Sequence, residues 1–165
     1  MIPQIKKILF ATDLSKNSAY AFYYAIHMAR RDEAKIVILH AVEPLPPMLV
    51  AFEDFVYRVA KDRWDDAVKT IHERLQEFSK KADAQMGISS LDLVSKTLIR
   101  LGHPVEEILK AVDEEGCDVI VLGTHGKGFL EQTFLGSVSS SVLLRSRRPV
   151  MVVPLPSENI NFDLI

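Results

Sequence analysis

Residues 118–128 read Asp-Val-Ile-Val-Leu-Gly-Thr-His-Gly-Lys-Gly. The run 119–122 is apolar without interruption, which is typical of a short strand that is covered on both faces. A glycine-rich segment extends from there to residue 136, and a helix is predicted to begin near Ser137. A buried strand, a loop and a helix in this order are typical of a parallel sheet, because parallel neighbours need crossover helices.

The same alternation continues on both sides of this stretch. Apolar runs predict four more strands, at residues 5–12, 35–42, 91–101 and 149–154. Between the strands, apolar residues at spacings of three and four predict helices near residues 19–31, 52–86, 104–115 and 137–146. The sequence therefore predicts an α/β fold with a doubly wound, five-stranded parallel sheet and helices on both faces. We expect one domain over residues 1–154 and a C-terminal tail at 155–165.

Two predictions about packing follow from the same pattern. Residues 91–101 contain several polar side chains, which favours an edge strand with one face in water. The long helix carries a continuous apolar stripe over residues 56–82, and we expect this stripe to pack in the core.

Composition argues against several classes of protein. The 20 Lys and Arg residues nearly balance the 22 Asp and Glu residues, which argues against a protein that binds nucleic acid or an anionic membrane. The longest apolar runs have four residues, whereas a membrane span needs about 20, so we expect neither a span nor a signal peptide. The single cysteine cannot form an intramolecular disulfide, and the histidines lack metal-ligand spacing. The sequence therefore predicts a soluble, cytoplasmic protein with no metal-ligating side chains.

The segment 123–136 is the first candidate for a binding site, because it holds four of the chain's seven glycines. Glycine lets a backbone approach a ligand closely, and the free N–H groups of the following helix would attract an anion. The alternative is an ordinary turn between a strand and a helix. The segment lacks a Walker A motif, since Val121 stands where the first glycine is required, and the turn after the first strand lacks the dinucleotide fingerprint.

A different spacing fits this segment: Gly123, Gly126 and Gly136-Ser137 form the pattern G-x2-G-x9-G-S. With the pieces KILFATD at 7–13, LHAV at 39–42, GHP at 102–104 and PVMVV at 149–153, it resembles the ATP-binding branch of the universal stress protein family. The resemblance runs from about residue 6 to residue 154. It implies the adenine-nucleotide alpha-hydrolase-like sheet order 3-2-1-4-5, with ATP bound where the strand order reverses.

The resemblance also implies which residues bind the nucleotide. Thr12 and Asp13 would contact the adenosine, and the backbone of Ala41 would contact the edge of the adenine. The loop and the following helix would surround the ribose and the phosphates. The implied cofactor-binding residues are Ala11, Thr12, Asp13, Ala41, Gly123, Gly126, Lys127, Gly136, Ser137, Val138 and Ser139. Asp13 has an alternative role as the N-cap of the first helix, and nothing is carried over onto residues 44–64.

Charge adds a requirement for a cation. Lys127 and Glu131 are the only fully charged residues between positions 123 and 142, and their charges cancel. A helix end supplies about half a charge, which is far less than a triphosphate carries. We therefore expect Mg²⁺ or Mn²⁺ to accompany ATP, held mainly by phosphate oxygens and water.

Several other side chains have a simpler interpretation than catalysis. His125 has no neighbouring carboxylate to orient it as a base, so we predict no catalytic residue and at most slow ATP hydrolysis. His40 is predicted to be partly buried with its hydrogen bonds satisfied. Cys117 has no basic neighbour in the sequence and is predicted to be unreactive. Ser139, Ser140 and Ser141 are either phosphate acceptors or inert serines on a helix surface.

The last strand indicates an assembly. Val150, Met151, Val152 and Val153 are apolar on both faces, although the implied strand order puts them at a sheet edge, where apolar residues need cover. The resemblance implies a homodimer that pairs these edges. The predicted function is a nucleotide-binding regulatory module of the stress response that signals to a protein partner. The alternatives are a nucleotide-free homodimeric interaction protein of the same fold and a slow ATPase.

Overall fold

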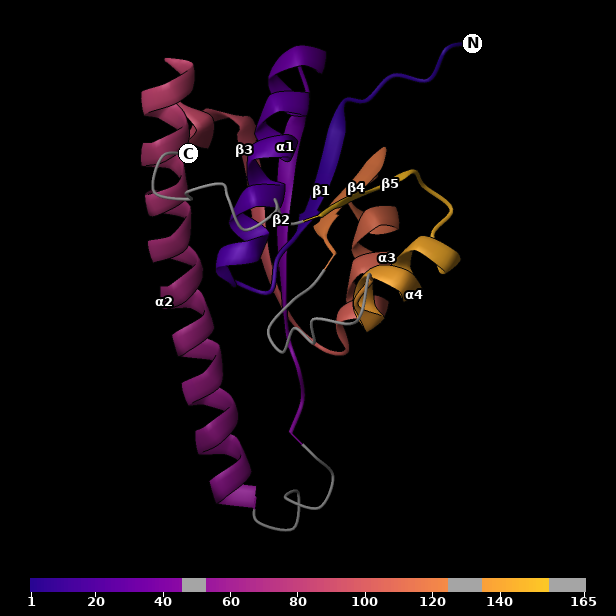
Figure 1. The fold of residues 1–165 in the computed structure, drawn as a ribbon. Coiled ribbons are helices and arrows are strands. Elements are labelled where there is room, and N and C mark those ends of the chain that lie inside the picture. The colour runs from indigo at the N-terminus through magenta and orange to yellow at the C-terminus, as the bar shows by residue number, and fades with distance from the viewer. Residues whose placement is uncertain (46–52, 125–134, 155–165) are drawn as a thin grey trace.

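The computed structural model describes residues 1–45, 53–124 and 135–154, and these form a five-stranded parallel sheet with helices around it (Figure 1). The strand order is β3-β2-β1-β4-β5, which confirms the predicted order. The strands are β1 (Lys7–Ala11), β2 (Lys35–Val42), β3 (Val94–Leu101), β4 (Val119–Gly123) and β5 (Val150–Val153). The helices are α1 (Lys16–Asp32), α2 (Glu53–Met86), the 3-10 helix η2 (Ser90–Leu93), α3 (Pro104–Glu114) and α4 (Ser137–Arg145).

The sheet separates two layers of helices. Helices α1 and α2 cover one face, and α3 and α4 cover the other (Figure 1). Strand β4 shows why its residues are all apolar: Val119 and Val121 pack on the side of α1, whereas Ile120 and Leu122 pack on the side of α3 and α4. Because successive side chains of a strand point to opposite faces, a strand covered on both faces needs apolar residues throughout.

Helix α2 is longer than the sheet that it covers. Its 34 residues extend over about 51 Å, whereas the eight residues of β2 extend over about 26 Å. Ile71, Phe78 and Ala82 are buried against the sheet, whereas Ala60 is half-buried and Trp64 is 37% exposed. The prediction that the stripe 56–82 packs in the core is therefore wrong for its N-terminal part, which extends past the carboxyl ends of the strands (Figure 1).

The turn between β1 and α1 excludes the alternative role of Asp13 as the N-cap of the helix. Ser15 is the N-cap of α1, and its hydroxyl oxygen accepts a hydrogen bond from the Ser18 amide. Asp13 therefore does not cap the helix. Its carboxylate instead accepts hydrogen bonds from the amide and the hydroxyl of Ser15, at 3.0 and 2.6 Å. Between them Leu14 has a φ of 65°, a left-handed conformation that makes the turn sharp.

Strand β3 lies at one edge of the sheet, as predicted, and Ser95, Lys96 and Thr97 face water. It begins at Val94 rather than at residue 91, because residues 90–93 form η2. Arg100 ties this edge to α3 through ion pairs with Glu107 and Glu114. In the part of the chain that the structure describes, we find no helix that is both long enough and apolar enough to cross a membrane.

Candidate functional site

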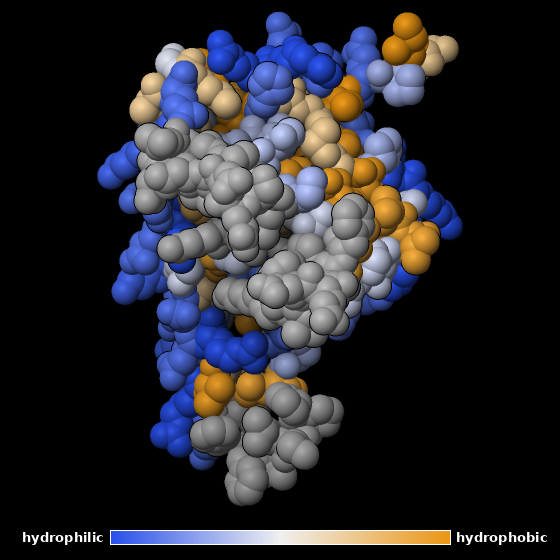
Figure 2. All heavy atoms as spheres, viewed as in Figure 1, coloured by the Kyte–Doolittle hydropathy of each residue, from blue (hydrophilic) through white to orange (hydrophobic). Residues whose placement is uncertain are grey.

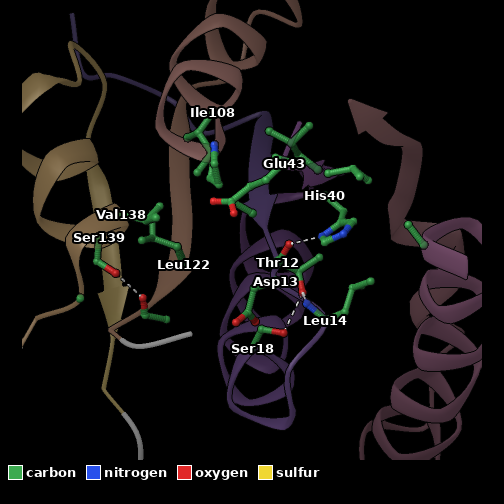
Figure 3. A pocket seen from close by; sticks show the side chains of 18 of the residues that line it. Thr12, Asp13, Leu14, Ser18, His40, Glu43, Ile108, Leu122, Val138 and Ser139 are labelled. Carbon is green, nitrogen blue, oxygen red and sulfur yellow. Dashed lines mark hydrogen bonds between the residues drawn. The ribbon is translucent and has the colours of Figure 1, made fainter. Parts of the chain in front are cut away.

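A cavity of about 810 Å³ lies at the carboxyl ends of the strands, where the sheet order reverses between β1 and β4. Open α/β sheets bind ligands at this position. The cavity is lined by the ends of β1, β2 and β4 and by parts of α2, α3 and α4 (Figure 3). Its volume lies within the range of small-molecule sites, about 300–1,000 Å³.

The structure brings most of the predicted site residues together around this cavity. Nine of them line it: Ala11, Thr12, Asp13, Ala41, Gly123, Gly136, Ser137, Val138 and Ser139. Gly126 and Lys127 lie outside the described residues, as does His125. Residues from four separate stretches of the sequence thus share one cavity, because parallel strands end at the same edge of the sheet.

The β1 side of the cavity is a turn held by internal hydrogen bonds. The Thr12 hydroxyl lies 2.7 Å from the Ser18 hydroxyl and accepts a hydrogen bond from the Leu14 amide. The Thr12 carbonyl oxygen lies 2.9 Å from Nδ1 of His40. Since a carbonyl oxygen only accepts, Nδ1 must be the donor. His40 is therefore half-buried with a hydrogen-bond partner, as predicted, and it fixes the turn that presents Asp13.

The α4 side of the cavity is the start of a helix that no side chain caps among the residues that the structure describes. Gly136 is the N-cap residue and offers no side chain for this purpose. The Gly136 amide donates to the Thr124 carbonyl oxygen at 2.7 Å, so it closes the base of the loop. The amides of the first turn, those of Ser137, Val138 and Ser139, have no partner in the preceding turn of a helix. They and the positive end of the helix dipole make this side suitable for an anion.

Ser139 has a structural role. Its side chain is buried, and its hydroxyl donates to the carbonyl oxygens of Gly123 at 2.7 Å and Thr124 at 3.1 Å. The interpretation of Ser139 as an inert surface serine is therefore wrong. The hydroxyl of Ser140 bonds back to the Gly136 carbonyl oxygen at 2.9 Å, within its own helix turn.

One wall of the cavity was missed by the sequence analysis. Arg63, Asp66 and Thr70 of α2 line the cavity beside Ala67. Positions 63, 66, 67 and 70 follow one another at the three- and four-residue steps of one helix face. This spacing was visible in the sequence. What the sequence did not give is where this face lies relative to the end of the sheet. Glu43, directly after β2, is a second lining residue that was missed.

The lining residues that the structure describes carry an excess of negative charge. Asp13, Glu43 and Asp66 contribute three carboxylates, and Arg63 contributes one guanidinium group. Asp13 follows β1, Glu43 follows β2 and Asp66 belongs to α2, whereas the helix start belongs to α4. Among the described residues, no group of three or more His, Cys, Asp or Glu side chains is arranged to hold a metal ion.

Cys117 lies away from this cavity and is buried. Burial raises the pKa of its thiol to about 11, because the thiolate would lose its hydration. The positive charge of Lys7 lowers the pKa, but by less than burial raises it. The thiol is protonated at neutral pH, in line with the predicted lack of reactivity.

The sequence matches the family described as the universal stress protein family over residues 4–154. It is 28% identical over 152 residues to the universal stress protein MJ0577 of Methanocaldococcus jannaschii, a match that covers 90% of this chain and 94% of that protein. It is 32% identical over 148 residues to a universal stress protein of Thermus aquaticus, covering 90% of this chain and 98% of that protein.

Solved structures share the fold. The structure of MJ0577 superposes with a TM-score of 0.77 at 26% identity, over 94% of this chain and 100% of that chain. A universal stress protein in complex with cAMP gives a TM-score of 0.59 at 23% identity, over 92% and 98% of the two chains. A universal stress protein of Archaeoglobus fulgidus in complex with dAMP gives 0.50 at 21% identity, over 90% and 97%. The family match extends from before β1 to beyond the end of β5, so this chain belongs to the universal stress protein family.

Proposed function

We propose that the cavity binds an adenine nucleotide, ATP together with Mg²⁺ or Mn²⁺, and that the protein is a regulatory nucleotide-binding module rather than an enzyme. The observation that carries the proposal is the start of α4, where the N-cap Gly136 offers no side chain to the first amides and which lines the same cavity as Ala41 and Asp13. An anion-binding helix end and a nucleoside-sized space thus share one cavity. Two proteins of this fold are described in complex with cAMP and dAMP, which supports adenine nucleotides as the ligand class.

The phosphates would bind at the α4 side. The backbone amides of Ser137, Val138 and Ser139 supply donors there without a countercharge, and Gly123 at the end of β4 leaves room for close approach. Lys127 and Gly126 belong to the same predicted set. The adenosine would lie toward Asp13 and Ala41, at the ends of β1 and β2.

The charges of the cavity support the need for a cation. Three carboxylates and one guanidinium group among the described lining residues would repel a triphosphate. A divalent cation held by phosphate oxygens would reduce this repulsion. We expect binding of ATP to weaken strongly when the cation is removed with a chelator, and binding of adenosine to stay unchanged.

The experiment is calorimetric titration of the full chain with ATP in the presence of Mg²⁺, repeated with Gly123→Val. The valine side chain would occupy the space beside the start of α4. We therefore expect saturable binding of ATP to the original protein and no binding to the variant. Urea denaturation checks that Gly123→Val still folds. Unchanged affinity in a folded variant would show that the ligand site is elsewhere.

No binding to the original protein would instead favour a nucleotide-free interaction protein, and turnover well above that of Gly123→Val would favour a slow ATPase.

We also propose that the chain forms a homodimer through β5. This strand is an edge of the sheet, and within the described residues it pairs only with β4. Helix α4 contacts β5, and its Leu144 is 84% exposed. Figure 2 shows hydrophobic residues gathered on the side of the molecule where α4 and β5 lie. Pairing two β5 edges would cover this surface.

A further inference from the structure

Glu43 lines the cavity, but the proposed function assigns it no contact with the ligand. It follows β2 directly, two residues after Ala41, and it lines the cavity. Figure 3 shows its carboxylate pointing away from β2 and into the cavity. The side chain is therefore placed to meet a ligand between the predicted adenine contact at Ala41 and the start of α4.

Glu43 is exposed in the absence of a ligand, and its carboxylate has no hydrogen-bond or ion-pair partner among the residues that the structure describes. Asp13, the neighbouring acid, differs in this respect, since Ser15 donates two hydrogen bonds to its carboxylate. A ligand in the cavity would remove water from Glu43, and a carboxylate that loses water needs new donors. The ligand therefore has to donate a hydrogen bond to this carboxylate, or its affinity is lowered by the free energy of removing water from Glu43.

We propose that Glu43 is a specificity-determining residue of the nucleotide site and accepts a hydrogen bond from the neutral, nucleoside half of the ligand. This inference rests on the proposed function. The donors available there are the ribose hydroxyls and the exocyclic amino group of adenine. A phosphate group offers no such donor, and its charge opposes that of Glu43. Glu43 thus sets the direction of the nucleotide, with the phosphates at α4 and the donor-rich half at the end of β2.

Removing the carboxylate separates this role from that of a bystander. A bystander carboxylate repels the triphosphate, so Glu43→Gln and Glu43→Ala would tighten ATP binding and leave adenosine unaffected. A carboxylate that accepts a hydrogen bond from the nucleoside stabilises both ligands. Its removal would then weaken adenosine and ATP alike. The two roles predict changes of opposite sign for ATP.

The experiment is titration of the original chain, Glu43→Gln and Glu43→Ala with ATP and with adenosine. We expect Glu43→Ala to weaken both ligands by about tenfold to a hundredfold, the loss typical of a hydrogen bond to a charged group. Glu43→Gln keeps a neutral acceptor and should lose less. The matched control is Asp62→Asn, which removes one carboxylate from an exposed position of α2 that does not line the cavity. Its affinities should change by less than about twofold.

Ligand analogues identify the donor group. The 2′-deoxy, 3′-deoxy and purine riboside triphosphates each lack one candidate donor. The analogue that lacks the group bonded to Glu43 should bind the original chain weakly. Its affinity should not fall further in Glu43→Ala, because the two changes remove the same interaction. Equal losses for all three analogues in Glu43→Ala, or ATP binding that is unchanged or tighter, would overturn the inference while the proposed function stands. An original chain that binds neither ATP nor adenosine would overturn both.

Discussion

The hydroxyl of Ser139 donates to the carbonyl oxygen of Gly123 across 2.7 Å and so fastens the first turn of α4 to the last residue of β4. The Gly136 amide makes a second link, to the Thr124 carbonyl oxygen. These bonds close the base of the segment between β4 and α4. The helix start that we propose as the phosphate site is thereby held at a fixed place at the edge of the sheet.

Ser139→Ala should lower the free energy of unfolding by about 1–3 kcal/mol, because the half-buried carbonyl oxygen of Gly123 and the buried one of Thr124 lose their side-chain donor. Urea denaturation measures this change. The matched control is Ser140→Ala in the same helix turn, where the hydroxyl bonds only to carbonyls of its own helix turn. We expect the control to change stability by less than about 0.5 kcal/mol. Equal effects of the two substitutions would show that the Ser139 link is unimportant.

Ser137→Pro should weaken the binding of ATP without unfolding α4. Proline is well tolerated at the first position of a helix, where it removes an amide that has no helical partner. The loss should be about fivefold to tenfold for ATP, since one neutral hydrogen bond is removed, and adenosine should bind as before. Calorimetric titration measures both affinities. Ser137→Ala, which keeps the amide and removes only the hydroxyl, separates the two donors of this residue; equal losses in both variants would contradict a role for the amide.

The fold could be predicted from sequence because its signals are local. The apolar run 119–122 requires cover on both faces, and Pro104 and Gly116 mark the two ends of α3. The lengths of helices and strands were harder. The stripe on α2 gives the direction of its apolar face, but the depth of the sheet depends on β1 and β2, which lie elsewhere in the sequence. The exposure of Trp64 therefore could not be derived from periodicity.

The candidate site was predictable where one residue pattern covers one loop, and less so where distant elements meet. The glycine spacing identified Gly123, Gly136 and Ser137, which the structure brings to the cavity. Arg63 on α2 meets them only through tertiary packing, and no local pattern gives that distance. The N-cap is a further case, since Asp13 and Ser15 are both good caps, and the left-handed Leu14 between them decides in favour of Ser15.

Phe78→Ala should destabilise the protein far more than Trp64→Ala, although both residues belong to the same stripe of α2. Phe78 is 6% exposed and packs in the core, so its removal should cost about 3–5 kcal/mol. Trp64 is 37% exposed and lies outside the buried core, so we expect a smaller cost of about 1–2 kcal/mol. Urea denaturation of the two variants measures the difference. Similar costs would show that the N-terminal part of α2 is packed in solution.

The stability of the protein should fall between about pH 9 and pH 11 through Cys117. Burial raises the pKa of the thiol to about 11, above its ordinary 9.0. The unfolded chain therefore ionises first as the pH rises, so this contribution is complete below pH 9 and is lost as the pH passes through 11. The loss should be about 2–3 kcal/mol, because each unit of difference in pKa between the two states corresponds to about 1.4 kcal/mol. Denaturation at several pH values should show a smaller decrease for Cys117→Ala, and parallel curves would contradict a buried thiol.

Val152→Glu should convert the proposed homodimer to a monomer. Val152 lies on the edge strand β5, and a carboxylate there would be buried without a partner when two such edges pair. Light scattering at increasing protein concentration measures the mass. The matched control is Leu101→Glu on the opposite edge strand β3, where the side chain is 59% exposed. We expect Leu101→Glu to stay dimeric, because β5 and not β3 forms the interface.

Leu144→Glu on the exposed surface of α4 provides a second test that does not disturb the sheet. An unmodified chain that is monomeric at all concentrations would show that there is no homodimer. A dimer that survives Val152→Glu and dissociates in Leu101→Glu would show that the interface lies on another surface.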